Sequence, residues 1–357
     1  MQYYVFTEAD MSELSEKYMT QIAGNRALCR RLSLDILAGT LPHALILEGA
    51  SGSGKRLVAL NIATALACTS KHKDGASIPC LSCLECRKVF EGLCPDVIFV
   101  NRGEKATIGV EEARFVREDV KIIPNDLERK IYIIEEADKM TDQAQNALLL
   151  TLEEPPSYAV FILLCESASE LLETIRSRAP VFRTELMSAQ EIEKCILEKS
   201  DRARTLKAQD PSLLAQITVS AGGTVGRALD YLDERKFAPI KEARELTYDF
   251  LEAISDRAKA GAAIPLLSRF SSKRDTLQFQ LEMLLDAAVE LLILKKADGR
   301  ELVFFESEQK ALDLCELIPA SKLLAVSEAV NEAIEENKRN ANVRLLLMKM
   351  ATSIKIL

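Results

Sequence analysis

The fold of this chain is decided by residues 44–66, which read ALILEGASGSGKRLVALNIATAL. The stretch begins with four apolar residues, and a short continuous apolar run predicts a strand of a parallel sheet that is buried on both faces. A glycine-rich turn follows, and after Lys55 the leucine and isoleucine residues recur with helical spacing. Strand, glycine-rich turn and helix in this order are the context that a phosphate-binding loop requires.

The glycine-rich turn supplies the groups that bind phosphate. Its glycines let the backbone wrap around a phosphate so that N–H groups converge on the oxygens, and Lys55 adds a positive charge. The pattern should end with Ser or Thr, whose hydroxyl binds Mg²⁺, but this chain has Arg56. A guanidinium does not bind Mg²⁺ and repels it. The nucleotide-binding residues predicted in the loop are Gly49, Gly52, Gly54, Lys55 and Arg56.

An acidic motif follows a second apolar run, at residues 131–134, where Glu135 and Glu136 come directly after the run. In P-loop ATPases an acidic residue at this place holds the metal, and Glu135 is one methylene longer than the usual Asp. Glu136 is suited to polarise water and would be the catalytic residue only if the chain hydrolyses ATP. Together with Arg56, these departures predict that ATP or ADP can bind, that Mg²⁺ binds poorly, and that hydrolysis is weak or absent.

Further apolar runs at residues 97–100 and 160–164 predict two more buried strands. Helical patterns lie between the runs, and the one over residues 141–152 ends before two prolines. We therefore predict an α/β P-loop domain with a parallel sheet at residues 1–186.

The rest of the chain carries helical patterns alone. Apolar residues recur at three- and four-residue steps in residues 281–292 and again in residues 343–350. We interpret these stripes as the core of a helical bundle.

Four of the nine cysteines lie close together in the sequence. Gaps of two residues let successive thiolates point at one centre, and a closed set of four sulfurs is typical of structural zinc. The predicted zinc ligands are Cys68, Cys80, Cys83 and Cys86, in a module over residues 68–94. His72 and Cys94 are possible substitute ligands. A redox-active Cys-x-x-Cys is the alternative, although the usual βαβ position is missing.

Composition narrows the class of protein. The chain has 357 residues and a net charge of −8, so it is a poor non-specific nucleic-acid binder unless a local patch or a partner supplies positive charge. No apolar run is long enough to span a membrane, and the N-terminus lacks the pattern of a secretory signal. We expect a cytoplasmic protein without a membrane partner.

Residues 141–156, TDQAQNALLLTLEEPP, resemble the AAA+ subunits of bacterial DNA polymerase III clamp loaders. Residues 41–44, the phosphate loop and the cysteine module placed after its helix add to this resemblance, as does TIRSR at residues 174–178. The resemblance implies a helical lid domain at residues 187–244 and a helical collar domain for oligomerisation at residues 245–357. It also implies as partners the gamma/tau and delta type subunits, the sliding clamp and primed DNA.

The same resemblance implies roles for two arginines. Arg178 stands in Ser-Arg-Ala, where the family has Ser-Arg-Cys, and the family's arginine reaches into the ATP site of a neighbouring subunit. An ion pair at a domain edge is the alternative role for Arg178. Arg227, in Gly-Arg-Ala-Leu, resembles the family's second nucleotide sensor.

Clamp loaders contain gamma/tau motors with an intact phosphate loop and delta-prime stators with a degraded one. Besides Arg56, Cys165 stands where the first sensor is usually a small polar residue, and Cys94-Pro95-Asp96 resembles a His-Pro-Asp of delta-prime chains. We therefore expect a delta-prime stator that supplies Arg178 in trans. A gamma/tau motor that hydrolyses ATP is the first alternative, and an unrelated zinc-bearing P-loop protein, such as a kinase or a DNA-repair switch, is the second.

Overall fold

The computed structural model describes residues 19, 22–70, 77–255, 263–296, 302, 304–305 and 308–354. The chain divides into two compact units, Met1–Met187 and Ser188–Leu357.

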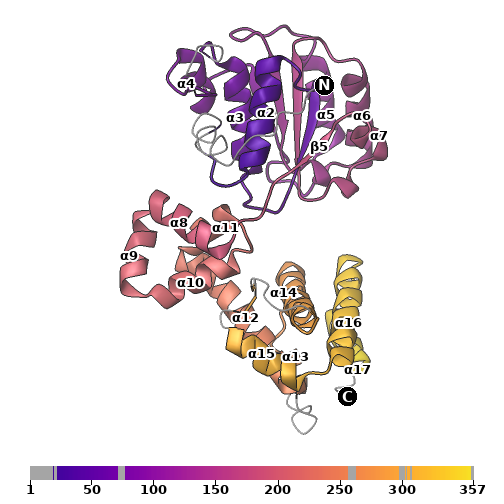
Figure 1. Ribbon diagram of the computed structural model, residues 1–357. Coiled ribbons are helices and arrows are strands. Elements are labelled where there is room, and N and C mark those ends of the chain that lie inside the picture. The colour runs from indigo at the N-terminus through magenta and orange to yellow at the C-terminus, as the bar shows by residue number, and fades with distance from the viewer. Residues whose placement is uncertain are drawn as a thin grey trace. The chain divides into compact units, whose positions relative to one another are not determined.

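The N-terminal unit is built on a five-stranded, fully parallel sheet with the order β2-β3-β4-β1-β5 (Figure 1). Its strands are β1 (Ala44–Glu48), β2 (Val97–Val100), β3 (Lys130–Ile134), β4 (Ala159–Cys165) and β5 (Val181–Arg183). The four strands predicted from apolar runs are confirmed. β5 was not predicted, because this edge strand has only three residues and alternates exposed, buried, exposed, so it forms no apolar run.

Helices cover both faces of the sheet (Figure 1). They are α2 (Arg26–Ala38), α3 (Lys55–Ala67), α4 (Leu84–Phe90), α5 (Val110–Asp119), α6 (Asp142–Glu153) and α7 (Glu173–Arg176), with short 3₁₀ turns at Ala137–Lys139 and Ala168–Glu170. Successive strand residues point to opposite faces: Leu45 packs with α2 and α3, whereas Ile46 packs with α5 and α6. Because both faces are buried, the strands are apolar without alternation.

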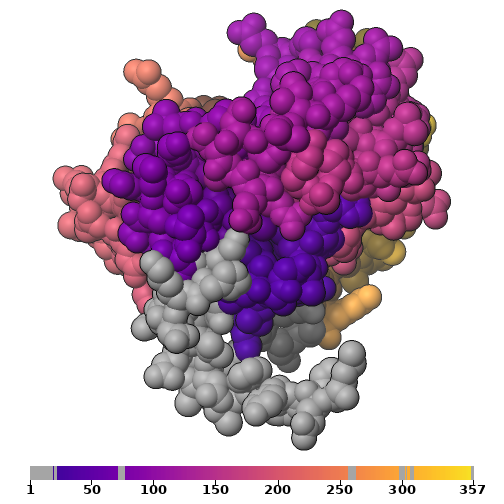
Figure 2. Space-filling view, turned by 90° about the horizontal axis from the view of Figure 1, so that it is seen from above, coloured from indigo at the N-terminus to yellow at the C-terminus, as the bar shows by residue number. Residues whose placement is uncertain are grey.

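The sheet order brings the candidate site together. β1 lies between β4 and β5, and β4 lies beside β3. Because the strands are parallel, the segments after β1, β3 and β4 all lie at the carboxyl ends of the strands. Open α/β sheets bind ligands at these ends. Figure 2 shows the surface of this unit from a second side, with the indigo residues at the start of its described part beside the purple and magenta residues that follow in the chain.

All regular elements in the described part of Ser188–Leu357 are helices. They are α8 (Ala189–Lys199), α9 (Asp201–Gln209), α10 (Pro211–Ser220), α11 (Val225–Tyr231), α12 (Glu234–Ser255), α13 (Ala263–Leu267), α14 (Arg274–Leu294), α15 (Glu308–Leu317), α16 (Ala320–Lys338) and α17 (Val343–Ser353). Leu281, Leu284 and Leu291 of the predicted stripe are fully buried in one core with α16 and α17, so the stripe is packing, as expected. Among the helices of the described residues, none has the length and apolarity that crossing a bilayer requires.

Candidate functional site

The phosphate loop joins β1 to α3 in a conformation that depends on its glycines. Gly52 and Gly54 have φ values of 79° and 90°, in the left-handed region that other residues rarely adopt. Gly54 is also the residue before α3, so the first N–H groups of this helix face the loop. The Lys55 ammonium donates to the carbonyl of Gly49 and, at 2.9 Å, to that of Ala50. The loop therefore gathers the groups that hold a phosphate.

Gly49 is constrained by space rather than by its backbone angles. A Cβ at this position would overlap the hydroxyl of Thr184 and lie 3.0 Å from Oγ of Ser53. The Thr184 hydroxyl donates to Oγ of Ser53 at 2.9 Å, and moving either side chain away from a Cβ at Gly49 would break this hydrogen bond.

We expect Gly49→Ala to lower the free energy of unfolding by about 1–3 kcal/mol, the usual penalty of overpacking. Thermal or urea unfolding of the full chain measures this loss. The double variant Gly49→Ala with Thr184→Ala removes the overlapping hydroxyl and should recover part of the stability. A Gly49→Ala protein as stable as the wild type would contradict the close packing.

Arg56 and Glu135, the two departures from the ATPase pattern, are in contact with each other. Nε of Arg56 lies 2.8 Å from Oε1 of Glu135, although its N–H is not aimed at that oxygen, so the contact is an ion pair without an aligned hydrogen bond. The guanidinium also lies over the ring of Phe99, 5.1 Å from its centroid. The side chain of Glu135 is 17% exposed and that of Arg56 is 69% exposed. The arginine therefore covers the carboxylate that a metal would use.

Glu136, the predicted water-polarising residue, is paired as well. Arg102 donates from Nε and Nη2 to the two carboxylate oxygens, at 2.8 and 3.4 Å, and this hydrogen bonding raises the pKa of Arg102. The sequence analysis missed Arg102. Arg102 comes just after β2, and β2 pairs with β3 in parallel. Because the carboxyl ends of neighbouring parallel strands lie side by side, this place in the sequence could have indicated a contact with Glu136. Both carboxylates after β3 are thus neutralised by arginines of the same unit.

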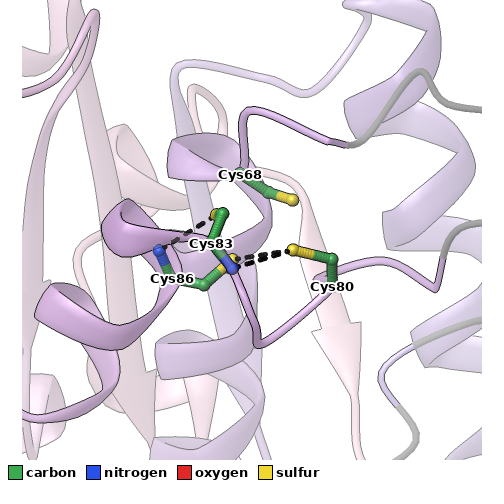
Figure 3. Close-up of side chains that lie close together, drawn as sticks. All are labelled: Cys68, Cys80, Cys83 and Cys86. Carbon is green, nitrogen blue, oxygen red and sulfur yellow. Dashed lines mark hydrogen bonds between the residues drawn. The ribbon is translucent and has the colours of Figure 1, made fainter.

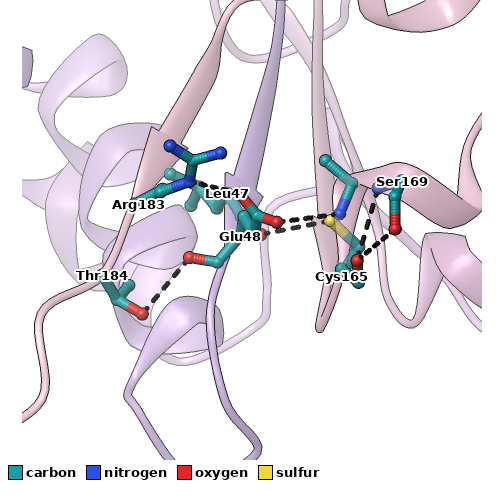
Figure 4. Close-up of polar contacts among 8 residues, drawn as sticks. Leu47, Glu48, Cys165, Ser169, Arg183 and Thr184 are labelled. Atoms are coloured by element: carbon teal, nitrogen blue, oxygen red, sulfur yellow. Dashed lines mark hydrogen bonds and ion pairs between the residues drawn. The ribbon is translucent and has the colours of Figure 1, made fainter. Parts of the chain in front are cut away.

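Glu48, the last residue of β1 before the phosphate loop, links β1 to β5 and to the segment after β4 (Figure 4). Its carboxylate accepts from the backbone N–H of Ala168 at 3.1 Å and from Arg183 at 2.6 Å, and these two contacts hold its pKa below the usual range. Cys165, at the predicted first sensor position, lies in the core, where burial raises its pKa to about 12. Its thiol is therefore a neutral core group at physiological pH.

The proposed trans-acting arginine lies at the surface of the N-terminal unit. Arg178 follows α7, and 36% of its side chain is exposed. Its guanidinium pairs with Glu153 at 2.7 Å and donates to the carbonyl of Thr174 at 2.8 Å. The ion pair considered as an alternative role is therefore present, and the side chain is still accessible. Arg227, the predicted second sensor, lies on α11 of the helical unit.

The charge of Arg227 acts on a carboxyl of its own unit. Burial raises the pKa of Asp286, as do Glu282 and Glu290, and the positive charge of Arg227 opposes this rise. Within the helical unit, Arg227 thus offsets part of an acidic cluster on α14.

The four predicted zinc ligands come together in space (Figure 3). Cys68 directly follows α3, Cys83 caps the N-terminus of α4, and Cys86 lies in the first turn of α4. Their sulfurs and that of Cys80 all lie within 4.8 Å of one another, with 3.9 Å between Cys80 and Cys86. Sulfurs bound to a tetrahedral zinc at about 2.3 Å are about 3.8 Å apart. The donor set and its spacing therefore fit a structural zinc.

Backbone hydrogen bonds reach two of the four sulfurs, whereas burial raises the pKa of Cys68 and Cys86. Backbone N–H groups of Cys83 and Cys86 point at the sulfurs of Cys80 and Cys83, each at 3.4 Å. Burial works to raise the pKa of Cys80, but hydrogen bonds from Ser82 and from the backbone lower it to about 6. Cys94, the other candidate for a substitute ligand, is buried in the core beside α3 and α4 and lies outside the four-sulfur group. His72 lies outside the described residues.

Asp96 holds the segment before β3 against the start of β2, and that segment in turn contacts α4 of the cysteine module. Its buried carboxylate accepts three backbone N–H groups, from Asn125, Asp126 and Leu127, at 2.6–2.8 Å. Lys88 of α4 pairs with Asp126 at 2.8 Å. The Cys-Pro-Asp segment singled out in the sequence thus has a structural role at the start of β2.

Residues 24–187 match the family described as "DNA polymerase III, delta subunit". The gamma subunit of DNA polymerase III from Buchnera aphidicola subsp. Acyrthosiphon pisum is 30% identical over 61% of this chain and 58% of that protein. The delta' subunit of Bacillus subtilis is 28% identical over 81% of this chain and 84% of that protein.

Solved structures give a weaker likeness. A DNA polymerase III gamma subunit-related protein from Thermotoga maritima is 18% identical, with a TM-score of 0.43, over 90% of this chain and 96% of that one. The chain spans between 57% and 59% of the length of three of these gamma and tau relatives and 32% of the tau subunit of Escherichia coli.

Proposed function

We propose that this chain, whose residues 24–187 belong to the family of DNA polymerase III clamp-loader subunits, is a delta-prime-type stator that does not hydrolyse ATP itself. In this role it assembles with gamma/tau and delta type subunits and helps to load the sliding clamp onto primed DNA. Its helical unit provides the lid and the collar, and the assembly works in the cytoplasm.

One observation carries this proposal. Arg56 occupies the place of the magnesium-binding hydroxyl and pairs with Glu135, the first carboxylate of the acidic motif, at 2.8 Å. ATP hydrolysis by P-loop proteins requires Mg²⁺ to bridge the β- and γ-phosphates. A site whose metal ligands are replaced by an internal ion pair is unsuited to hydrolysis, whatever nucleotide it binds.

The position of Arg178 supports a role in a neighbouring site. Its guanidinium is accessible, and Glu153 and the carbonyl of Thr174 hold it at the surface. An arginine presented in this way can stabilise the charge that develops on a transferred phosphoryl group in an adjoining subunit. Arg227 is proposed to sense nucleotide.

The cysteine cluster is proposed to hold one structural zinc through Cys68, Cys80, Cys83 and Cys86. With four protein ligands, zinc has no open position for a substrate, so it supplies folding energy rather than catalysis.

A gamma/tau-type motor is the second candidate. The 30% identity to a gamma subunit and the retained Lys55 and glycines favour it. If this candidate is right, Glu136 must leave Arg102 to polarise water.

Steady-state ATP hydrolysis by the isolated chain separates the two candidates. We expect only trace turnover with Mg²⁺, because neither Arg56 nor the paired Glu136 serves the reaction. In parallel, mixing with gamma/tau and delta type subunits should give a stable complex in size-exclusion chromatography. Brisk turnover by the isolated chain would establish the motor instead, and failure to form the complex would remove the stator role.

A further inference from the structure

We propose that Arg56 and Arg102 replace magnesium in this site, so that the phosphate loop binds the phosphates of a nucleotide in their metal-free form. The inference rests on the phosphate loop of the proposed function and adds the form of the ligand. It does not require a partner subunit or the trans role of Arg178.

Magnesium does not fit the residues at the end of β3. The hydroxyl that would bind it is replaced by Arg56, and the carboxylate that would receive it, Glu135, already contacts that guanidinium at 2.8 Å. A divalent cation here would have to displace one positive charge and approach another. Cation and guanidinium repel each other strongly at such distances, so the metal is excluded.

The two departures from the ATPase pattern explain each other. The additional methylene of Glu135 makes it a poor substitute for the usual Asp at a metal, but it extends the carboxylate toward Arg56. The ring of Phe99, on β2, lies against the guanidinium at 5.1 Å, and such cation–π contact helps to fix it over the carboxylate. The pair is thus held from two sides.

The net charge of this site equals that of a P-loop ATPase site with Mg²⁺ bound. In an ordinary P-loop site, one Mg²⁺ offsets two carboxylates and leaves the lysine to attract phosphate. Here Arg56 and Arg102 pair with Glu135 and Glu136, and together they carry the charge of one Mg²⁺. The phosphates of a metal-free nucleotide therefore meet a net attraction from Lys55 and from the N–H groups at the start of α3.

Binding of a fluorescent ADP to the isolated full chain tests the proposal, in buffer with EDTA and in buffer with Mg²⁺. The wild type should bind with the same Kd in both buffers or more weakly with Mg²⁺. The variant Arg56→Thr with Glu135→Asp restores the usual ligands and should bind at least about tenfold tighter with Mg²⁺ than with EDTA. Because the Arg56 side chain is mostly exposed, the variant should keep its fold, which its melting temperature checks.

Arg269→Thr is the control, since it breaks an exposed ion pair with Asp249 in the helical unit and should bind like the wild type. If pyrophosphate displaces the fluorescent ADP as efficiently as unlabelled ADP does, the site recognises the phosphates alone. If only unlabelled ADP displaces it, the site recognises the whole nucleotide. Both results support the proposal. No binding in either buffer, or binding of the wild type that Mg²⁺ tightens about tenfold, would overturn it. Either result leaves the stator role to be judged from the complex.

Discussion

Arg178→Ala is expected to slow ATP hydrolysis at the adjoining subunit's site by a factor of about 10³ to 10⁵, the range found for arginine fingers supplied in trans. The guanidinium lies at the surface, where Glu153 and the carbonyl of Thr174 hold it, and alanine removes the charge that would meet the transferred phosphoryl group. Turnover by the reconstituted complex measures the effect, and size-exclusion chromatography checks that assembly is intact.

Two control variants separate the finger from its surroundings. Arg176→Ala removes an exposed arginine only two residues away and should leave turnover unchanged. Glu153→Gln removes the ion pair but keeps the guanidinium, so a much smaller loss is expected than for Arg178→Ala. Turnover that survives Arg178→Ala intact would show that the arginine serves only as an ion pair within its own unit.

The sheet was predictable because its strands are buried on both faces. Leu45 and Ile46 face different helix layers, so β1 is apolar from Ala44 to Leu47 without alternation. β5 lacked this signal, since Val181 and Arg183 are exposed and Phe182 alone is buried. What defines β5 is its pairing with β1, a contact between segments far apart in the chain.

The candidate site divides in the same way. The glycines of the loop and the cysteines from Cys80 to Cys86 could be predicted from the sequence. The members of each group lie within a few residues of one another, so their spacing alone identifies them. The pairs of Arg56 with Glu135 and of Arg102 with Glu136 join the ends of different elements. The sequence alone indicated that Arg56 prevents metal binding. That Glu135 pairs with Arg56 could be predicted only with knowledge of the strand order.

Cys83→Ser is expected to abolish zinc binding, whereas elemental analysis of the wild type should find about one zinc per chain. Structural zinc contributes on the order of 10 kcal/mol to the folding of small zinc modules, so the loss should unfold residues 80–90 locally. Cys83 also caps α4 by accepting the N–H of Cys86, and serine is a good N-cap. The substitution therefore removes the metal ligand while preserving the cap.

Hydrogen exchange locates the damage. Protection should be lost around α4 but kept in β1, β3 and β4, whose buried side chains pack mainly against the sheet and its covering helices. Cys195→Ser, in the helical unit, is the matched control and should retain zinc and protection. Zinc that remains bound to the Cys83→Ser protein at full occupancy would contradict the four-sulfur site. A wild type that contains none would also do so, because the sulfurs would then come together through packing alone.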